Sequence, residues 1–149
     1  MNDKLIKELN DLIALDYDAI DAYQAAIDRL EDPTAASQLR TFMADHERHT
    51  VELGACVSQL GGDPARKGDL KRLLTKGKVV LAGLVGDRRI MEAMRSNEDD
   101  TNRAYEKALQ IEGLARHSQV QALIERNLSD ERRHRAWIVD YLRAVKATR

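Results

Sequence analysis

The sequence predicts an all-α protein built as a four-helix bundle. Its 149 residues include only two prolines and one phenylalanine, and Ala, Leu, Glu, Lys and Arg are abundant, as is typical of helices. Apolar residues recur every three or four positions along four long segments. Two short links and one long connection between the second and third segments indicate a bundle with one crossover. The length suits one domain, spanning residues 1–149.

The first helix is expected over about residues 3–31. Its apolar stripe is interrupted by Asp16, whereas Asp18, Asp21 and Asp28 lie off the stripe and are expected in solvent. The stripe positions keep a strict 4-3 spacing: Leu5, Leu9, Leu12, Asp16, Ala19, Tyr23, Ala26 and Leu30.

The second helix is expected over about residues 34–60. Asp32 suits its N-cap and Pro33 its first helical position, while Gly61-Gly62 ends it. Two histidines lie on its stripe and Asp45 lies one position beside it. The stripe consists of Leu39, Phe42, His46, His49, Leu53, Cys56 and Leu60.

The crossover occupies residues 61–86. Leucine spacing within residues 69–85 predicts a short extra helix there. The segment is basic, and we expect it to be a solvated cover; an anion-binding or partner-binding surface is the alternative.

The third and fourth helices repeat the pattern of the first two. The third is expected over about residues 87–112, with Asp87 as its cap and Gly113 at its end, and the fourth begins at Ser118. The stripe of the third helix contains Met91, Met94, Glu98, Thr101, Tyr105 and Ala108. The stripe of the fourth contains Val120, Ile124, Asn127, Glu131, His134, Ile138, Tyr141 and Val145.

The composition excludes several classes of protein. Charged residues make up 33% of the chain with a net charge of −1, which does not favour a nucleic-acid binder or a disordered chain. Cys56 is the only cysteine, so no internal disulfide can form and a cytoplasmic location is expected. The longest apolar run, residues 79–85, is too short to cross a membrane, and no cleavable signal is recognised.

The polar interruptions of the four stripes are expected to meet. Each lies within about two residues of its helix centre, or roughly 3 Å along the axis. Two related stretches, Asp45-His46-Glu47-Arg48-His49 and Asp130-Glu131-Arg132-Arg133-His134, carry pairs at i, i+3 spacing that can reach one ion. Six residues are therefore candidate metal ligands: Asp16, His46, His49, Glu98, Glu131 and His134.

Buried carboxylates and imidazoles need partners, and they are ligands for iron, manganese and zinc. Tyr23 and Tyr105 follow Asp16 and Glu98 by seven residues, so their hydroxyls are expected to support ligand carboxylates. The alternative is a metal-free layer of His–carboxylate hydrogen bonds, with the tyrosines as ordinary core residues.

These residues resemble those of the ferritin-like di-iron carboxylate proteins, such as bacterioferritin and rubrerythrin. In that family two helices each give a Glu and two each give Glu-x-x-His. The stretch from Leu9 through Asp16 to Tyr23 resembles the bacterioferritin first helix, and Glu131-x-x-His134 followed by Trp137 resembles its fourth. Leu60-Gly61-Gly62-Asp63-Pro64 and Asn97-Glu98-Asp99 are similar to a small bacterial ferritin-like branch of unassigned function.

The resemblance implies a ferritin-like bundle with a di-iron site and no haem, in which manganese or zinc could replace iron. Its expected chemistry is oxidation of Fe(II) by dioxygen or peroxide, in a monomer or homodimer rather than a cage. Two departures stand out: Asp16 replaces a Glu, and His46 stands where the family has a bridging Glu, a position that Asp45 could fill instead. The rival function is a non-catalytic, stress-related bundle that binds zinc, manganese or no metal and acts through protein contacts.

Overall fold

The computed structural model describes residues 2–67, 81 and 83–147, and these residues form four long α-helices, one short 3₁₀ helix and no strand. This confirms the predicted all-α bundle. The extra helix expected in residues 69–85 lies largely outside the described residues. The elements are α1 (Asp3–Arg29), α2 (Pro33–Gln59), α4 (Asp87–Ala108), η1 (Leu114–Arg116) and α5 (Ser118–Ala147).

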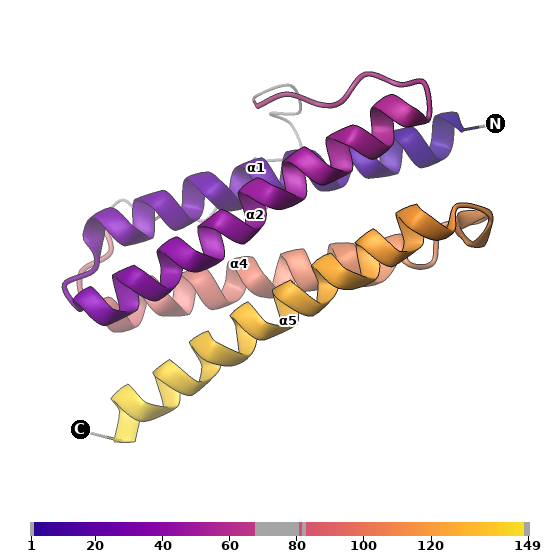
Figure 1. Ribbon diagram of the computed structural model, residues 1–149. Coiled ribbons are helices and arrows are strands. Elements are labelled where there is room, and N and C mark those ends of the chain that lie inside the picture. Colours follow the sequence, from indigo (N-terminus) through magenta and orange to yellow (C-terminus); the bar gives the residue numbers. More distant parts are fainter. Residues whose placement is uncertain (1, 68–80, 82, 148–149) are drawn as a thin grey trace.

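The helices form two antiparallel pairs that pack against each other (Figure 1). α1 pairs with α2, and α4 pairs with α5. Between the pairs, α1 packs closely on α4, whereas α2 contacts α5 less extensively. α2 ends at the opposite end of the bundle from the start of α4. The seam between α2 and α5 is the less tightly closed side.

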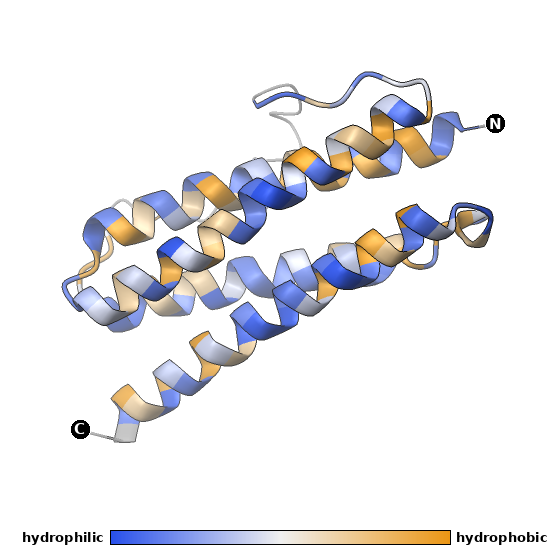
Figure 2. Cartoon of the chain, in the orientation of Figure 1, coloured by the Kyte–Doolittle hydropathy of each residue, from blue (hydrophilic) through white to orange (hydrophobic). Residues whose placement is uncertain are grey.

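The core consists of two apolar clusters separated by a polar layer. Figure 2 shows hydrophilic residues midway along α2 and α5, between more apolar stretches. One cluster includes Leu9, Leu53, Tyr105 and Ile124, and the other includes Tyr23, Leu39, Met91 and Ile138. Each cluster therefore contains one buried tyrosine next to the polar layer, Tyr105 in the first and Tyr23 in the second.

The start and end of α2 follow the predicted local chemistry. Asp32 accepts hydrogen bonds from the backbone N–H groups of Thr34 (2.9 Å) and Ala35 (3.4 Å), and Pro33 is the first helical residue. At the other end Gly61 has a φ of 91°, a left-handed conformation that glycine adopts without strain. The boundaries of α1 and α2 lie within two residues of those expected.

Two expectations about α4 are wrong. Asp87 does not cap its own helix: its carboxylate accepts from the backbone N–H groups of Glu31 and Asp32, both at 2.9 Å, and ties α4 to the turn between α1 and α2. The helix also ends at Ala108, four residues early. The following turns place Leu109, Ile111 and Leu114 against the core, so their apolar side chains are at least partly removed from water.

Asp18 is a third correction, because it is buried at 5% exposure rather than solvated. Asp21 and Asp28 are exposed as expected. A position beside the stripe can be covered by neighbouring chain, and periodicity along one helix does not report such cover.

Candidate metal centre

The structure brings all six candidate ligands together in the polar layer. They come from all four long helices, and none is more than 1% exposed. They form two overlapping groups, within each of which one nitrogen or oxygen atom per residue lies within 4.8 Å of the others. One group is Asp16, His46, His49 and Glu131; the other is His46, Glu98, Glu131 and His134.

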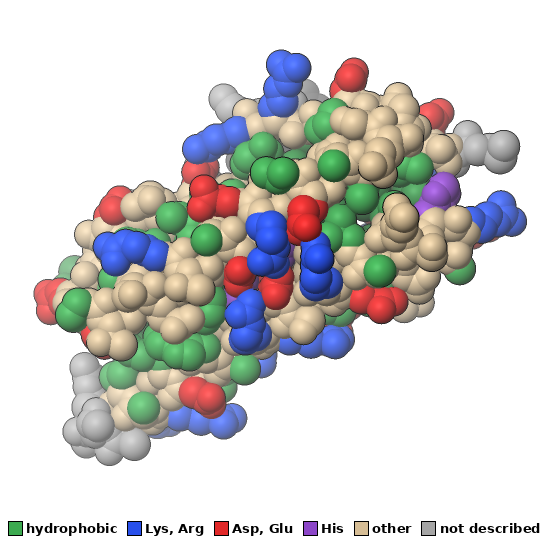
Figure 3. All heavy atoms as spheres, in the orientation of Figure 1, with side chains coloured by type: hydrophobic (Ala, Val, Ile, Leu, Met, Phe, Trp, Pro, Cys, Tyr) green, Lys and Arg blue, Asp and Glu red, His purple; other side chains and the backbone are tan. Residues whose placement is uncertain are grey.

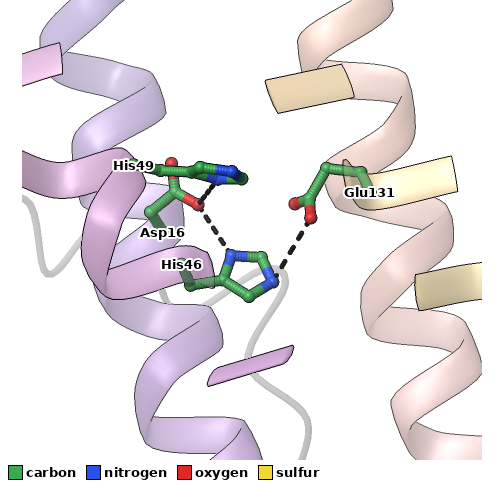
Figure 4. Close-up of side chains that lie close together, drawn as sticks. All are labelled: Asp16, His46, His49 and Glu131. Atoms are coloured by element: carbon green, nitrogen blue, oxygen red, sulfur yellow. Dashed lines mark hydrogen bonds and ion pairs between the residues drawn. The ribbon is translucent and has the colours of Figure 1, made fainter. Parts of the chain in front are cut away.

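His46 and Glu131 belong to both groups, whereas Asp45 belongs to neither. In the first group Asp16 Oδ1 lies 2.7 Å from His46 Nδ1 and 3.2 Å from His49 Nδ1. Figure 4 shows the ring of His46 between Asp16 on one side and Glu131 on the other. Of the two residues considered for the central position, His46 is the one placed there.

The second group has the spacing of a small coordination shell. His46 Nε2 lies 3.4 Å from both Glu98 Oε2 and Glu131 Oε2. His134 Nδ1 lies 3.4 Å from Glu98 Oε2 and 3.1 Å from Glu131 Oε2. Ligands about 2.0–2.1 Å from a tetrahedral ion are roughly 3.3 Å apart, so these donors could receive an ion with little movement.

Three atoms of this second group are buried without a hydrogen-bond partner among the described residues. They are both carboxylate oxygens of Glu131 and Nδ1 of His134. A buried polar atom that makes no hydrogen bond costs about 1–3 kcal/mol, and here the ion pair between His134 Nδ1 and Glu131 Oε2 at 3.1 Å offsets only part of that cost. Carboxylate oxygen and imidazole nitrogen are ordinary ligands of iron, manganese and zinc. The residues present therefore fit a bound transition-metal ion.

Two aspartates hold the outer sides of two of the histidines. Asp45 on α2 lies 2.8 Å from Nε2 of His134 on α5, and Asp130 on α5 lies 2.9 Å from Nε2 of His49 on α2. The contacts are reciprocal across the seam. A carboxylate on the outer nitrogen fixes the ring so that the inner nitrogen faces the centre.

Two arginines each form ion pairs with both of these aspartates at the seam between α2 and α5. Arg133 contacts Asp45 at 2.9 Å and Asp130 at 3.0 Å, and Arg48 pairs with the same two aspartates. We call Asp45, Arg48, Asp130 and Arg133 the seam quartet. Figure 3 shows basic and acidic side chains gathered at the middle of this face. The quartet lies between solvent and the outer nitrogens of His49 and His134.

The two tyrosines support the carboxylates of the opposite helix. Tyr105 on α4 donates to Asp16 Oδ2 on α1 at 2.6 Å, and Tyr23 on α1 donates to Glu98 on α4. Both tyrosines are at most 1% exposed. Each hydroxyl fixes a carboxylate that the chain places in one of the two ligand groups.

Asn102 joins α4 to α5 at the height of the ligands. Its side-chain amide donates to the backbone carbonyls of Glu98 (2.7 Å) and Glu131 (3.2 Å). Thr101 also donates to Glu98 Oε1 at 3.3 Å. These bonds fix the relative height of two carboxylates on different helices.

The charged groups of the layer shift one another's protonation. Burial lowers the pKa of His134, but the carboxylates of Asp45, Glu131 and Glu98 outweigh burial and raise it to about 10. Burial raises the pKa of Glu98, but the neighbouring imidazoles of His134 and His46 outweigh it and lower the value to about 2. Despite burial, Asp16 and Glu131 also raise the pKa of His46. Protons on the imidazoles thus balance the carboxylates when no cation is bound.

The sequence pattern indicates no role for four residues of this region, although the first three lie within the two related stretches. They are Asp130, Arg48, Arg133 and Asn102. A signal for Asp130 was present, because it precedes Glu131 as Asp45 precedes His46. The relation between the two halves therefore pairs Asp130 with Asp45. No comparable signal marks Asn102.

A sequence model of a protein family, described as "Domain of unknown function (DUF2383)", matches residues 4–111. The chain belongs to the DUF2383 family. The match includes α1, α2 and α4, and with them Asp16, both histidines of α2, and Glu98. No curated protein matches this DUF2383 chain in sequence.

The fold of this DUF2383 protein is ferritin-like. A ferritin-like di-iron carboxylate protein from Bacillus anthracis str. Ames is 22% identical, with a TM-score of 0.78 over 94% of this chain and 96% of that one. Dps from Staphylococcus aureus is 18% identical, with a TM-score of 0.79 over 92% and 93%. Desulfovibrio desulfuricans bacterioferritin, whose structure is described with a di-iron site, is 25% identical, with a TM-score of 0.82 over 98% and 82%.

The described helices give no sign of a membrane-spanning segment. None of them combines the length and the apolar character needed to cross a bilayer.

Proposed function

We propose that this protein binds two divalent metal ions in the polar layer and that both of these ions are iron. The observation that carries this proposal is the overlap of two buried ligand groups through His46 and Glu131. Both oxygens of Glu131 and Nδ1 of His134 support it, because they are buried, make no hydrogen bond among the described residues and are common metal-ligand atoms.

The chain's own residues would hold, orient and shield the metals. Asp16 and His49 serve one side of the layer, Glu98 and His134 the other, and His46 and Glu131 lie between them. Asp45 and Asp130 orient the histidines, and the tyrosines orient the carboxylates. The apolar clusters above and below exclude water from the layer.

Bound iron would supply the electrons that reduce dioxygen or peroxide, so the proposed activity is oxidation of Fe(II). The likeness to the bacterioferritin structure, with its di-iron site, supports iron as the metal. We further propose a single-domain protein that acts in the cytoplasm as a monomer or homodimer, as expected from the sequence.

A second candidate function is supported by the second ligand group. Its two nitrogens and two oxygens lie 3.1–3.4 Å apart where they face each other, which suits tetrahedral zinc without redox chemistry. His46 in place of a carboxylate also leaves only three inner carboxylates to neutralise an oxidised iron pair. A zinc or manganese protein that acts through protein contacts is therefore the alternative.

Anaerobic titration with Fe(II), followed by exposure to oxygen, separates these functions. Iron oxidation predicts about two Fe(II) per chain and oxygen consumption proportional to bound iron. Tight binding of zinc with no iron-dependent oxygen consumption would favour the alternative. Absence of any metal binding would leave a structural layer of hydrogen bonds. Asp28→Asn is the matched control, since Asp28 is an exposed carboxylate of α1.

A further inference from the structure

We infer that His46 bridges the two metal ions through both of its ring nitrogens, as an imidazolate. Nδ1 would bind the ion held by Asp16 and His49, and Nε2 the ion held by Glu98, Glu131 and His134. The inference rests on the metal binding proposed above and names the element that joins the two ions.

The two nitrogens of His46 face opposite ligand groups. Nδ1 lies 2.7 Å from Asp16 Oδ1, whereas Nε2 lies 3.4 Å from Glu98 Oε2 and from Glu131 Oε2. Figure 4 shows the ring spanning the space between α1 and Glu131 of α5. A ring in this position presents one donor atom to each side.

The other two histidines of the layer are held differently. His49 and His134 each turn Nδ1 inward and give Nε2 to an outer aspartate, Asp130 and Asp45. Among the described residues His46 makes no such outer contact, and both of its nitrogens meet inner carboxylates. His46 is also fully buried. Two of the histidines are thus arranged as terminal ligands and His46 as a link.

Charge balance supports the same assignment. Asp16, Glu98 and Glu131 carry three negative charges, one fewer than the four positive charges of two divalent ions. An imidazolate adds the fourth, and buried charges are stable only when they are compensated. Binding would therefore release the ring protons of His46 to solvent while each nitrogen forms one bond to metal.

The bridge predicts a metal–metal separation that differs from that of a carboxylate-bridged pair. Two metal–nitrogen bonds of about 2 Å each, placed on opposite sides of the ring, give roughly 6 Å. Paired metal sites with shorter bridges lie about 3.5–4 Å apart. The difference is large enough to measure directly.

The test is the separation of two Mn(II) ions, bound anaerobically to the full chain and located by anomalous diffraction. We expect about 6 Å, with His46 bound through both nitrogens. Two ions about 3.5–4 Å apart, a single ion, or His46 bound through one nitrogen would overturn the bridge. If no Mn(II), Fe(II) or Zn(II) binds in solution, the proposed metal binding itself fails, which elemental analysis distinguishes from a failed bridge.

Two variants sharpen the experiment. His46→Glu replaces the ring by a carboxylate, so the separation should shorten to about 3.5–4 Å. The matched variant His49→Gln removes a terminal ligand and should weaken one site while leaving the ring of His46 in place. An unchanged separation in folded His46→Glu protein would overturn the inference. If that variant does not fold, the separation in the unaltered protein still decides.

Discussion

The hydroxyl of Tyr105 on α4 donates to Asp16 on α1 at 2.6 Å, across the centre of the bundle. Tyr23 on α1 makes the reverse contact with Glu98 on α4. Each tyrosine belongs to a different apolar cluster. The two bonds therefore fasten both ends of the core to the polar layer between them.

Tyr105→Phe should destabilise the metal-free protein and weaken metal binding. Asp16 Oδ2 would lose its donor while remaining buried, at a cost of about 1–3 kcal/mol. One kcal/mol corresponds to about 2–4 °C in Tm for a chain of this size. Loss of a residue that orients a ligand lowers metal affinity by about 10–100-fold. Calorimetry and metal titration measure the two effects.

The control for this change is Tyr17→Phe, because Tyr17 packs partly buried against the same apolar cluster as Tyr105. Its hydroxyl makes no hydrogen bond to the ligand groups among the described residues. Equal losses of metal affinity in the two variants would show that the bond to Asp16 has no special role.

Within the seam quartet, the aspartates should matter more for metal binding than the arginines. Asp130→Asn and Asp45→Asn remove the negative charge on the outer nitrogens of His49 and His134, and each should lower metal affinity by about 10–100-fold. Arg48→Ala and Arg133→Ala should cost less than about 1 kcal/mol of stability, because these arginines are 43% and 52% exposed. Competition with a chelator measures the affinities.

A larger loss of affinity in the arginine variants than in the aspartate variants would contradict this ranking. It would mean that the arginines, and not the aspartates, position the imidazoles. The double variant Asp45→Asn with Asp130→Asn tests whether the two contacts act independently, since they serve different histidines.

Much of the layer could be predicted because it follows from periodicity within single helices. Asp16, His46 and Glu131 each stand on a stripe that is otherwise apolar, near the midpoint of a helix. Helices of similar length with aligned ends then place these residues at one height. The apolar stripe alone indicates which side of each helix faces the core.

The parts that could not be predicted depend on contacts between helices. Asp130 lies one position off its stripe, and only the packing of α5 beside α2 brings it to His49. Asp87 looked like a local cap, but its partners lie 55 and 56 residues away. Asp18 is buried although periodicity places it in solvent. Such contacts leave no mark on the spacing of one helix.

The metal-free protein should be most stable between about pH 4.5 and 6.5. The pKa of His134 is raised to about 10 from 6.5. The stabilisation that its protonated form gives the fold is therefore complete below pH 6.5 and is lost as the pH rises toward 10. The pKa of Glu98 is lowered to about 2 from 4.5. The stabilisation that its ionised form gives the fold is therefore complete above pH 4.5 and is lost as the pH falls toward 2. Tm should fall on both sides of this window.

Bound metal should remove the alkaline fall, because the cation then takes the place of the imidazole protons. Calorimetry with a chelator and with saturating metal, from pH 5 to 9, measures the contrast. A Tm that declines equally in both samples would mean that these protons do not balance the layer.

Glu131→Gln should abolish stoichiometric metal binding and leave the fold intact. Glu131 belongs to both ligand groups, so its loss affects both sides of the layer. Neither of its oxygens has a hydrogen-bond partner among the described residues, and burial raises its pKa. In the metal-free protein the cost of burying this carboxylate offsets its attraction to His46 and His134, so a neutral amide of the same size should shift Tm by only a few degrees. Asp28→Asn supplies an exposed control that Asp18, being buried, cannot.

Elemental analysis after removal of loosely bound ions measures the metal content. Full metal content in folded Glu131→Gln protein would remove Glu131 from the site, whereas loss of the fold would show that the carboxylate's attraction to His46 outweighs its unmet hydrogen bonds.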